Sequence, residues 1–257
     1  VNGQDDIILL QRGSYDMPSS FALKYYPNAE TKDLEISGGY EDFFGNPCGL
    51  VPSTSDARAT VLNGGQLDLT LPDGSGSITL NALTIANMLS DNQHSVPVAI
   101  GALANSMGSV SVRNTSFFGN VSTGNQAVHI GNSQGSILVQ DSIFAENGSF
   151  AGVSPAEVAN FGTSGSLCTE VINVTVRQNN SSSPAMEVRN ASCQSLLAND
   201  IFWGNNGGNI AVVFAAMTGV VNSDFEDLGE VSGTASSGLI SLDPQFNSEG
   251  GLRDASP

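Results

Sequence analysis

The tetrapeptide Phe117-Phe118-Gly119-Asn120 belongs to a short motif that returns about every 28 residues and ends each time in Asn. The other copies are Thr84-Ile85-Ala86-Asn87, Phe144-Ala145-Glu146-Asn147, Val176-Arg177-Gln178-Asn179 and Phe202-Trp203-Gly204-Asn205, with a degenerate copy at Phe225-Glu226-Asp227-Leu228. The terminal Asn residues are 33, 27, 32 and 26 positions apart. A period of this length indicates a solenoid or a similar array, in which each repeat is one structural unit.

Two further patterns share this period. Large apolar residues recur at intervals of 30, 28, 30 and 26 positions, at Ile100, Ile130, Val158, Val188 and Phe214. A second set of segments begins with Gly-Ser at positions 76, 108, 135 and 165 and then alternates, as in Val110-Ser111-Val112-Arg113. Alternation with a period of two and β-branched residues predicts short strands.

The repeats predict an all-β fold, a single-stranded right-handed parallel β-helix (solenoid) of about nine coils with about 28 residues each. Leucine-rich repeats need Leu at fixed short offsets, and propeller blades need about 40 residues or more with a Trp-Asp signature. In a β-helix, each strand pairs with its counterpart one coil away, ~4.8 Å distant. Right-handed winding follows the general preference of crossovers between parallel strands.

The recurring motif predicts two stacks of side chains. We expect an apolar column inside the solenoid, formed by Phe117, Phe144, Val176, Phe202 and Phe225. We expect Asn120, Asn147, Asn179 and Asn205 at equivalent corners of consecutive coils, where their amides bond to the next coil.

The chain is interpreted as one β-helix domain over residues 1–257. It divides into irregular N-terminal coils (1–75), regular coils (76–228) and a closing segment (229–257). Pro47, Gly49 and Pro52 predict that the stretch from Phe43 to Arg58 is a loop that leaves the stack.

Composition excludes several classes of partner. The chain has 25 acidic and 8 basic residues, which gives a net charge of -17. This charge disfavours nucleic acids and anionic membrane surfaces, because their phosphates require Lys and Arg. It favours cations and neutral or basic partners. No run approaches the roughly 18 apolar residues that span a bilayer, so we expect no membrane insertion.

The cysteines leave two interpretations open. Cys168 and Cys193 are 25 residues apart, close to one repeat, so they could lie on adjacent coils. Their offsets within the repeat differ by one residue, which weakens the case for a bridge. A disulfide would suit an oxidising compartment, and the alternative is two buried thiols. Cys48 has no evident partner.

The two ends of the chain carry a family resemblance. Asp5-Asp6-Ile7-Ile8-Leu9-Leu10-Gln11-Arg12-Gly13-Ser14-Tyr15 and Asp243-Pro244-Gln245-Phe246 resemble the opening and closing segments of right-handed parallel β-helix proteins of bacterial surfaces and secretions. The Phe-x-x-Asn motif also resembles repeats of polymorphic autotransporter adhesins, although their Gly-Gly-Ala-Ile motif is absent. The resemblance implies an extracellular or outer cell-surface location. Because both ends stop abruptly relative to the family, we interpret the chain as a fragment of a longer protein.

One outward column contains candidate chemistry. If Ile130, Val158 and Val188 point inward, strand alternation turns His129, Glu157 and Glu187 outward on successive coils, with Arg189 beside the last. Two carboxylates one coil apart would raise each other's pKa, and a His beside them could act as a base or a metal ligand. The alternative interpretation is a solvated polar face.

A second acidic group lies near the last repeat. Asp224, Asp227 and Glu230, with Glu226 between them, could bind Ca²⁺ through their carboxylate oxygens, and no other cofactor is expected. Their order does not match an EF-hand loop. The sequence also lacks the motifs of polygalacturonase-like enzymes, and its central Arg residues do not lie beside the Asp cluster that pectate-lyase-like enzymes use.

These observations favour a non-enzymatic role. We expect an extracellular or cell-surface β-helix that acts as an adhesin, a stalk or a glycan-contacting structural module. Its partners would be a polysaccharide, a host or cell-surface ligand, or other chains of an extracellular assembly. The alternative is a carbohydrate-active enzyme, a polysaccharide lyase or glycoside hydrolase, with His129, Glu157, Glu187 and Arg189 as its site.

Overall fold

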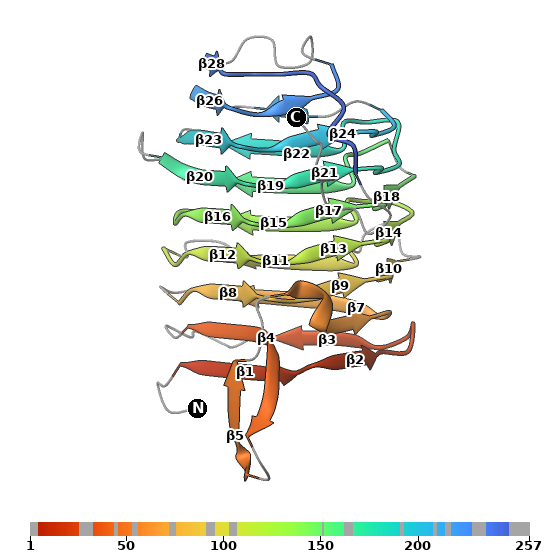
Figure 1. Ribbon diagram of the computed structural model, residues 1–257, viewed down its shortest axis with the longest axis vertical. Coiled ribbons are helices and arrows are strands. Elements are labelled where there is room, and N and C mark those ends of the chain that lie inside the picture. Colours follow the sequence, from red (N-terminus) through yellow and green to blue (C-terminus); the bar gives the residue numbers. More distant parts are fainter. Residues whose placement is uncertain are drawn as a thin grey trace.

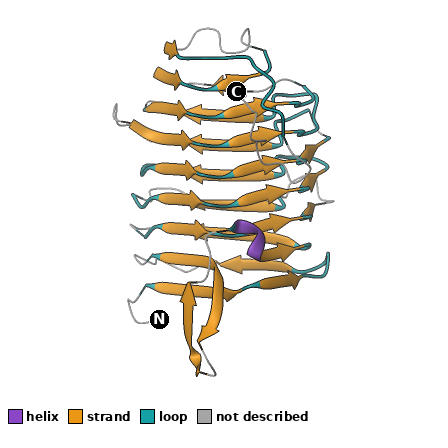
Figure 2. Cartoon of the chain, in the orientation of Figure 1, coloured by secondary structure: helices purple, strands orange, loops and turns teal. Residues whose placement is uncertain are grey.

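The computed structural model of the protein describes residues 5–25, 33–43, 46–52, 56–71, 76–90, 96–102, 107–150, 152–161, 167–190, 193–207, 210–213, 217–227 and 235–246. These residues form a parallel β-solenoid, in which short strands stack in layers along one axis (Figure 1). Helix is confined, within the described residues, to the 3-10 turn Ala57–Ala59 (Figure 2). The predicted all-β parallel solenoid is therefore confirmed.

Three long sheets form the faces of the solenoid. Sheet A contains β1 (Asp6–Gln11), β4 (Leu34–Phe43), β8 (Ile78–Asn81), β12 (Val110–Arg113), β16 (Ile137–Gln140), β20 (Leu167–Ile172), β23 (Gln194–Ala198), β26 (Met217–Val221) and β28 (Ala235–Ser237). Sheet B contains β2 (Gly13–Asp16), β6 (Thr60–Asn63), β9 (Thr84–Ala86), β13 (Ser116–Phe118), β17 (Ile143–Ala145), β21 (Thr175–Arg177), β24 (Ile201–Trp203) and β27 (Asp224–Phe225). Sheet C contains β3 (Ala22–Tyr25), β7 (Gln66–Leu71), β11 (Val98–Ala102), β15 (Val128–Asn132), β19 (Ala156–Asn160), β22 (Met186–Asn190) and β25 (Ile210–Val213). A small sheet joins β10 (Leu89–Ser90), β14 (Val121–Ser122) and β18 (Gly148–Ser149).

The solenoid has fewer regular turns than the predicted number of coils. About five turns, from β8 to β25, each add one strand to sheets A, B and C. Towards the N-terminus, β4 continues into an antiparallel pair with β5 (Asn46–Pro52). Towards the C-terminus, sheet C has no strand beyond β25 among the described residues. The prediction of about nine coils is therefore wrong in number, because only about five turns are regular and the layers near the ends depart from this repeat.

The predicted apolar column is confirmed. Phe117, Phe144, Val176, Phe202 and Phe225 pair in one register across sheet B and are fully buried. The rings of Phe117 and Phe144 stack with centroids 4.8 Å apart, and those of Phe202 and Phe225 stack at 4.9 Å. Aliphatic residues of sheets A and C close the rest of the core, which drives folding through the burial of apolar surface.

The corner Asn ladder is also confirmed. The backbone N–H and the side-chain amide of Asn120 both donate to Asn147 Oδ1, at 3.1 and 2.9 Å. Asn147 repeats these two bonds to Asn179 Oδ1, and Asn179 repeats them to Asn205 Oδ1. Each buried amide is thereby satisfied by the coil above it.

The first copy of the motif was assigned to the wrong register. Ile85 pairs with Phe117, so Asn87 is level with Gly119 and Met88 is level with Asn120. The Met88 backbone N–H donates to Asn120 Oδ1 at 3.0 Å, so the ladder ends on a backbone group. Asn87 is exposed and bonds outside the ladder to Asn63 Oδ1 at 2.9 Å.

Two other predicted alignments shift in the structure. Val212, rather than Phe214, pairs with Val188, and Phe214 lies outside the described residues. Ile137 pairs with Thr169, two residues beyond the expected Leu167. In its pairing with β23, β20 has a bulge at Cys168, which is buried like Cys193. Cys168 and Cys193 form a disulfide between adjacent layers, with their Cα atoms 5.9 Å apart.

A second, outer column of Asn and Asp was not predicted. Asn114, Asp141, Asn173, Asn199 and Asn222 adopt positive φ angles of 46° to 57° at the turn between sheets A and B. Asn and Asp tolerate this left-handed conformation better than other non-glycine residues. The Asn173 amide donates to Asp141 Oδ1 at 2.9 Å, and the Asn199 amide donates to Asn173 Oδ1 at 3.2 Å. The column therefore stabilises a turn that the backbone alone disfavours.

The predicted loop after Phe43 is partly a strand. It leaves the stack, as expected, but β5 pairs antiparallel with the outer half of β4 and forms a hairpin that projects from the N-terminal end (Figure 1). The departure follows Gly38 and Gly39. A Cβ at Gly38 would lie 2.3 Å from the Ala82 carbonyl oxygen, so only glycine fits there.

Candidate functional site

The structure brings the four predicted site residues together on the outer face of sheet C. His129, Glu157 and Glu187 are consecutive partners on β15, β19 and β22, and Arg189 lies two residues beyond Glu187 on β22. The column continues to Ala99 on one side and to Ala211 on the other. The expected last member, Val213, is instead level with Arg189, because β25 is shifted by two residues relative to the prediction.

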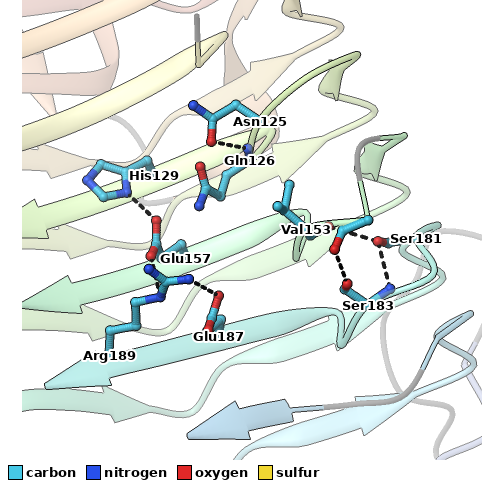
Figure 3. Close-up of polar contacts among 10 residues, drawn as sticks. Asn125, Gln126, His129, Val153, Glu157, Ser181, Ser183, Glu187 and Arg189 are labelled. Carbon is cyan, nitrogen blue, oxygen red and sulfur yellow. Dashed lines mark hydrogen bonds and ion pairs between the residues drawn. The ribbon is translucent and has the colours of Figure 1, made fainter. Parts of the chain in front are cut away.

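The four side chains form one polar network (Figure 3). His129 Nδ1 and Glu157 Oε2 are 2.8 Å apart. Arg189 bridges the two carboxylates: its Nε atom is 2.8 Å from Glu157 Oε1, and its Nη2 atom donates to Glu187 Oε2 at 3.1 Å. The hydrogen on Nε is not directed at Glu157, so that contact is an ion pair rather than a hydrogen bond.

Glu157 is the buried centre of this network. Its side chain is 5% exposed, compared with 27% for His129 and 36% for Arg189. A buried carboxylate is costly unless it is paired, and here a cationic or polar partner lies against each of its oxygens. The hydrogen bond to Glu187, together with the charges of Glu157 and Glu187, raises the pKa of Arg189. The guanidinium therefore stays charged and holds the two carboxylates together.

Glycine at position 131 allows the imidazole to lie against the sheet. A Cβ on Gly131 would be 2.6 Å from His129 Nε2, so any other residue here would displace the imidazole ring. An ionised Glu157 only accepts hydrogen bonds, so His129 donates from Nδ1 in this contact. Sequence reasoning missed Gly131, although a glycine inside a strand often marks a close approach.

The arrangement does not present two free carboxyl groups. A glycoside hydrolase needs a carboxylic acid and a carboxylate roughly 5–9.5 Å apart, with the scissile bond between them. Here one guanidinium contacts both Glu157 and Glu187, and Glu157 also contacts His129. What the network presents to solvent is an imidazole and part of a guanidinium.

The described residues contain only part of the second predicted site. Asp224 is buried, which raises its pKa, and its Oδ1 atom accepts the Leu242 backbone N–H at 3.2 Å. Glu226 Oε2 accepts the Gly204 backbone N–H at 2.8 Å, and Asp227 is exposed. Glu230 lies outside the described residues. The part of the chain that is described contains no group of three His, Cys, Asp or Glu that could hold a metal ion. The calcium site stays a prediction.

Comparison with known proteins returned no match among family models, curated protein sequences or solved structures. Within the described residues, no helix has the length and apolar character that crossing a membrane requires. Any proposal for function therefore depends on the geometry of the solenoid and its surface.

Proposed function

We propose that this chain is an extracellular or cell-surface β-helix that acts as an adhesin, a stalk or a glycan-contacting structural module. The observation that carries the proposal is the neutralisation of Glu157, whose two oxygens lie 2.8 Å from His129 and from Arg189. The partners of this carboxylate are needed by the face of sheet C, because removing one of them would leave an uncompensated buried charge. In this proposal the network around Glu157 has a structural role in the solenoid.

The location is supported by the disulfide. Bridges such as Cys168–Cys193 persist in oxidising compartments and are rare in the cytosol. The net charge of -17 keeps a long repetitive surface soluble and disfavours anionic partners. We therefore propose a neutral polysaccharide or a host or cell-surface ligand as the partner, with other chains of an extracellular assembly as a second possibility for a stalk.

The finer structural identity is part of the same proposal. We propose that the solenoid winds to the right, in keeping with the general preference of parallel crossovers. The opening and closing segments and the Phe-x-x-Asn motif support a relationship to β-helix proteins of bacterial surfaces, including the polymorphic autotransporter adhesins.

A carbohydrate-active enzyme is the second candidate, and one observation favours it. Glu157 contacts His129 Nδ1 at 2.8 Å and so orients the imidazole ring, whose Nε2 atom lies beside Gly131. A histidine positioned by a carboxylate is a common general base, and a polysaccharide lyase needs such a base to remove a proton from the sugar ring. In that reading Arg189 would bind an anionic group of the substrate.

One experiment separates the two candidates. A panel of neutral and acidic polysaccharides is tested for binding by calorimetry and for cleavage by the release of reducing or unsaturated ends. Glu157→Gln and Glu187→Gln are compared with Glu170→Gln, a control on the neighbouring sheet A. We expect binding without cleavage, and similar binding by all three variants. Cleavage by the unmodified protein that Glu157→Gln abolishes and Glu170→Gln preserves would establish the enzyme instead.

A further inference from the structure

A cleft with different chemistry lies at the N-terminal end of the solenoid. It is shallow and largely open to solvent, has a volume of about 250 Å³ and is lined by Gln11, Arg12, Tyr40 and Glu41. These residues come from the end of β1 and the middle of β4, at the base of the projecting hairpin (Figure 1). The cleft is far along the chain from the network around Glu157 and shares no residue with it.

A β-bulge builds the cleft. Leu9 pairs with Ser37 but Gln11 pairs with Tyr40, so Gly38 and Gly39 together face a single residue of β1. Gly39 has a φ of 78°, and its N–H donates to Thr60 Oγ1 at 2.8 Å. Bulges turn the side chains that follow them and are common next to functional sites. Here the bulge sets Tyr40 and Glu41 against the end of β1, where the Arg12 N–H donates to the Tyr40 carbonyl at 2.9 Å.

The polar groups of the cleft balance in charge and remain accessible. Arg12 and Glu41 form an ion pair, and their side chains are 54% and 49% exposed. Nearby, hydrogen bonds from Arg58, with a smaller contribution from the charge of Arg12, lower the pKa of Asp56. Arg12 and Arg58 carry two positive charges, and Glu41 and Asp56 carry two negative charges. A charged ligand of either sign would therefore meet side chains of like charge, whereas a neutral ligand would not.

Neutral sugars match these groups. A tyrosine ring offers an apolar face for the C–H groups of a sugar and a hydroxyl that can bond. Guanidinium donors and carboxylate acceptors, held side by side, suit adjacent sugar hydroxyls through charge-assisted hydrogen bonds. Pockets for drug-sized ligands occupy roughly 300–1,000 Å³, so this smaller cleft suits a single ring.

The distribution of aromatic residues points to the same end of the molecule. All four tyrosines lie between positions 15 and 40. Tyr15 is 37% exposed, and its hydroxyl donates to the Gln11 carbonyl at 3.2 Å, next to the cleft. In the regular coils the recurring aromatic residue is a buried Phe. The tyrosines are therefore concentrated where the solenoid departs from its repeat, whereas the single Trp, Trp203, lies on β24.

We propose that the cleft lined by Gln11, Arg12, Tyr40 and Glu41 binds one ring of a neutral glycan. The proposal rests on the glycan-contacting role proposed above and assigns its site to the hairpin base rather than to sheet C. Tyr40 supplies the platform, and the Arg12–Glu41 pair supplies the hydrogen bonds that select hydroxyl groups.

The test is a binding titration with defined oligosaccharides. Neutral probes are oligomers of glucose, galactose, mannose and N-acetylglucosamine, and the acidic probe is oligogalacturonate. The variants are Tyr40→Ala and Glu41→Gln, with Glu170→Gln as the control, and each is checked for an unchanged β-sheet circular dichroism spectrum. If Tyr40→Ala does not fold, Tyr40→Leu and Glu41→Gln still test the platform and the hydrogen bonds separately.

We expect a neutral oligosaccharide to bind, with a Kd about tenfold or more higher in each cleft variant and unchanged in Glu170→Gln. Binding that the cleft variants retain in full would overturn the cleft and leave the glycan-contacting function in place. Binding of oligogalacturonate alone would overturn the assignment to neutral sugars. The absence of binding to every probe by the unmodified protein would overturn both this inference and the glycan-contacting role.

Discussion

The regular turns from β8 to β25 and the N-terminal layers from β1 to β7 differ in how successive coils pack on one another. In the regular turns from β12 onwards, the coils repeat one buried Phe or Val and one corner Asn, and Asn120, Asn147 and Asn179 each bond to the Asn of the next coil. In the N-terminal layers, a bulge and a hairpin interrupt the stack, and the Asn ladder ends at Met88 before it reaches them.

This difference separates scaffold from candidate binding surface. Where a position repeats, its side chain is explained by its contacts with the coils on either side, and no ligand needs to be invoked. Where the repeat breaks, residues such as Gly38 and Tyr40 have no equivalent on the following coils. Departures from the repeat are thus the places to look for function in a solenoid.

The largest expected effect tests whether the Phe column holds the regular turns together. Phe144→Ala should lower the free energy of unfolding by about 3–5 kcal/mol, because it leaves a cavity beside Phe117 in a fully buried stack. Tyr15→Ala, in the N-terminal layers, should cost only about 1 kcal/mol because its side chain is already partly exposed. Urea unfolding followed by circular dichroism measures both. Equal losses would contradict the contrast between the two regions.

The next effect concerns the bridge between adjacent regular layers. Replacing Cys168 and Cys193 together by Ser should lower the free energy of unfolding by about 3 kcal/mol, since the disulfide closes a segment with a sequence separation of 25 residues. The same loss should follow from reduction of the unmodified protein. Binding at the N-terminal cleft should persist under native conditions. If the double variant were as stable as the parent protein, the bridge would not be a structural element of the regular turns.

The Asn ladder gives a smaller effect with a matched control. Asn147→Ala should cost about 1–3 kcal/mol, because it leaves the Asn120 amide and backbone N–H without their shared acceptor. Asn87→Ala alters the same motif at a position outside the ladder and should cost less than about 1 kcal/mol. The comparison is made by thermal unfolding at one pH. A larger loss in the Asn87 variant would mean that the register of the first copy is the predicted one after all.

The smallest expected effect concerns Asp200, a buried carboxyl inside the regular turns. Asp200 is 1% exposed and occupies the corner position that Ser142 and Ser223 fill on other coils. Burial raises the pKa of Asp200 well above its usual value, although the Val174 N–H donates to its Oδ1 atom. Its stabilising contribution is therefore complete below a pH of about 3.9 and is lost as the pH rises through the higher folded-state value.

Asp200→Ser should remove this pH dependence, because a serine can accept the Val174 N–H as Ser142 accepts that of Thr115. We expect the variant to be at least as stable as the unmodified protein at pH 7 and to lose that advantage near pH 4. Thermal unfolding between pH 4 and 8 measures the difference. A constant difference across this range would show that Asp200 does not titrate in it.

Much of the solenoid could be predicted from the repeat. The burial of Phe117 and Phe144, the ladder from Asn120 to Asn205 and the shared face of His129, Glu157 and Glu187 all follow from period and alternation. The left-handed Asn and Asp column at the turn was missed, because its members vary in type and their common feature is a backbone angle. The cleft was missed because it depends on a bulge between β1 and β4.

The sequence by itself therefore determined the period of the coils and which side chains face inward, because both depend on short-range alternation along each strand. Only the tertiary structure decided which residues are level with one another. One extra residue, as at Cys168 or at Gly38–Gly39, shifts part of a strand against its neighbour and interrupts the alternation there. The shift in β4 brought Tyr40 level with Gln11, and the side-chain contacts of Arg189 joined the outward side chains of Glu157 and Glu187 into one network.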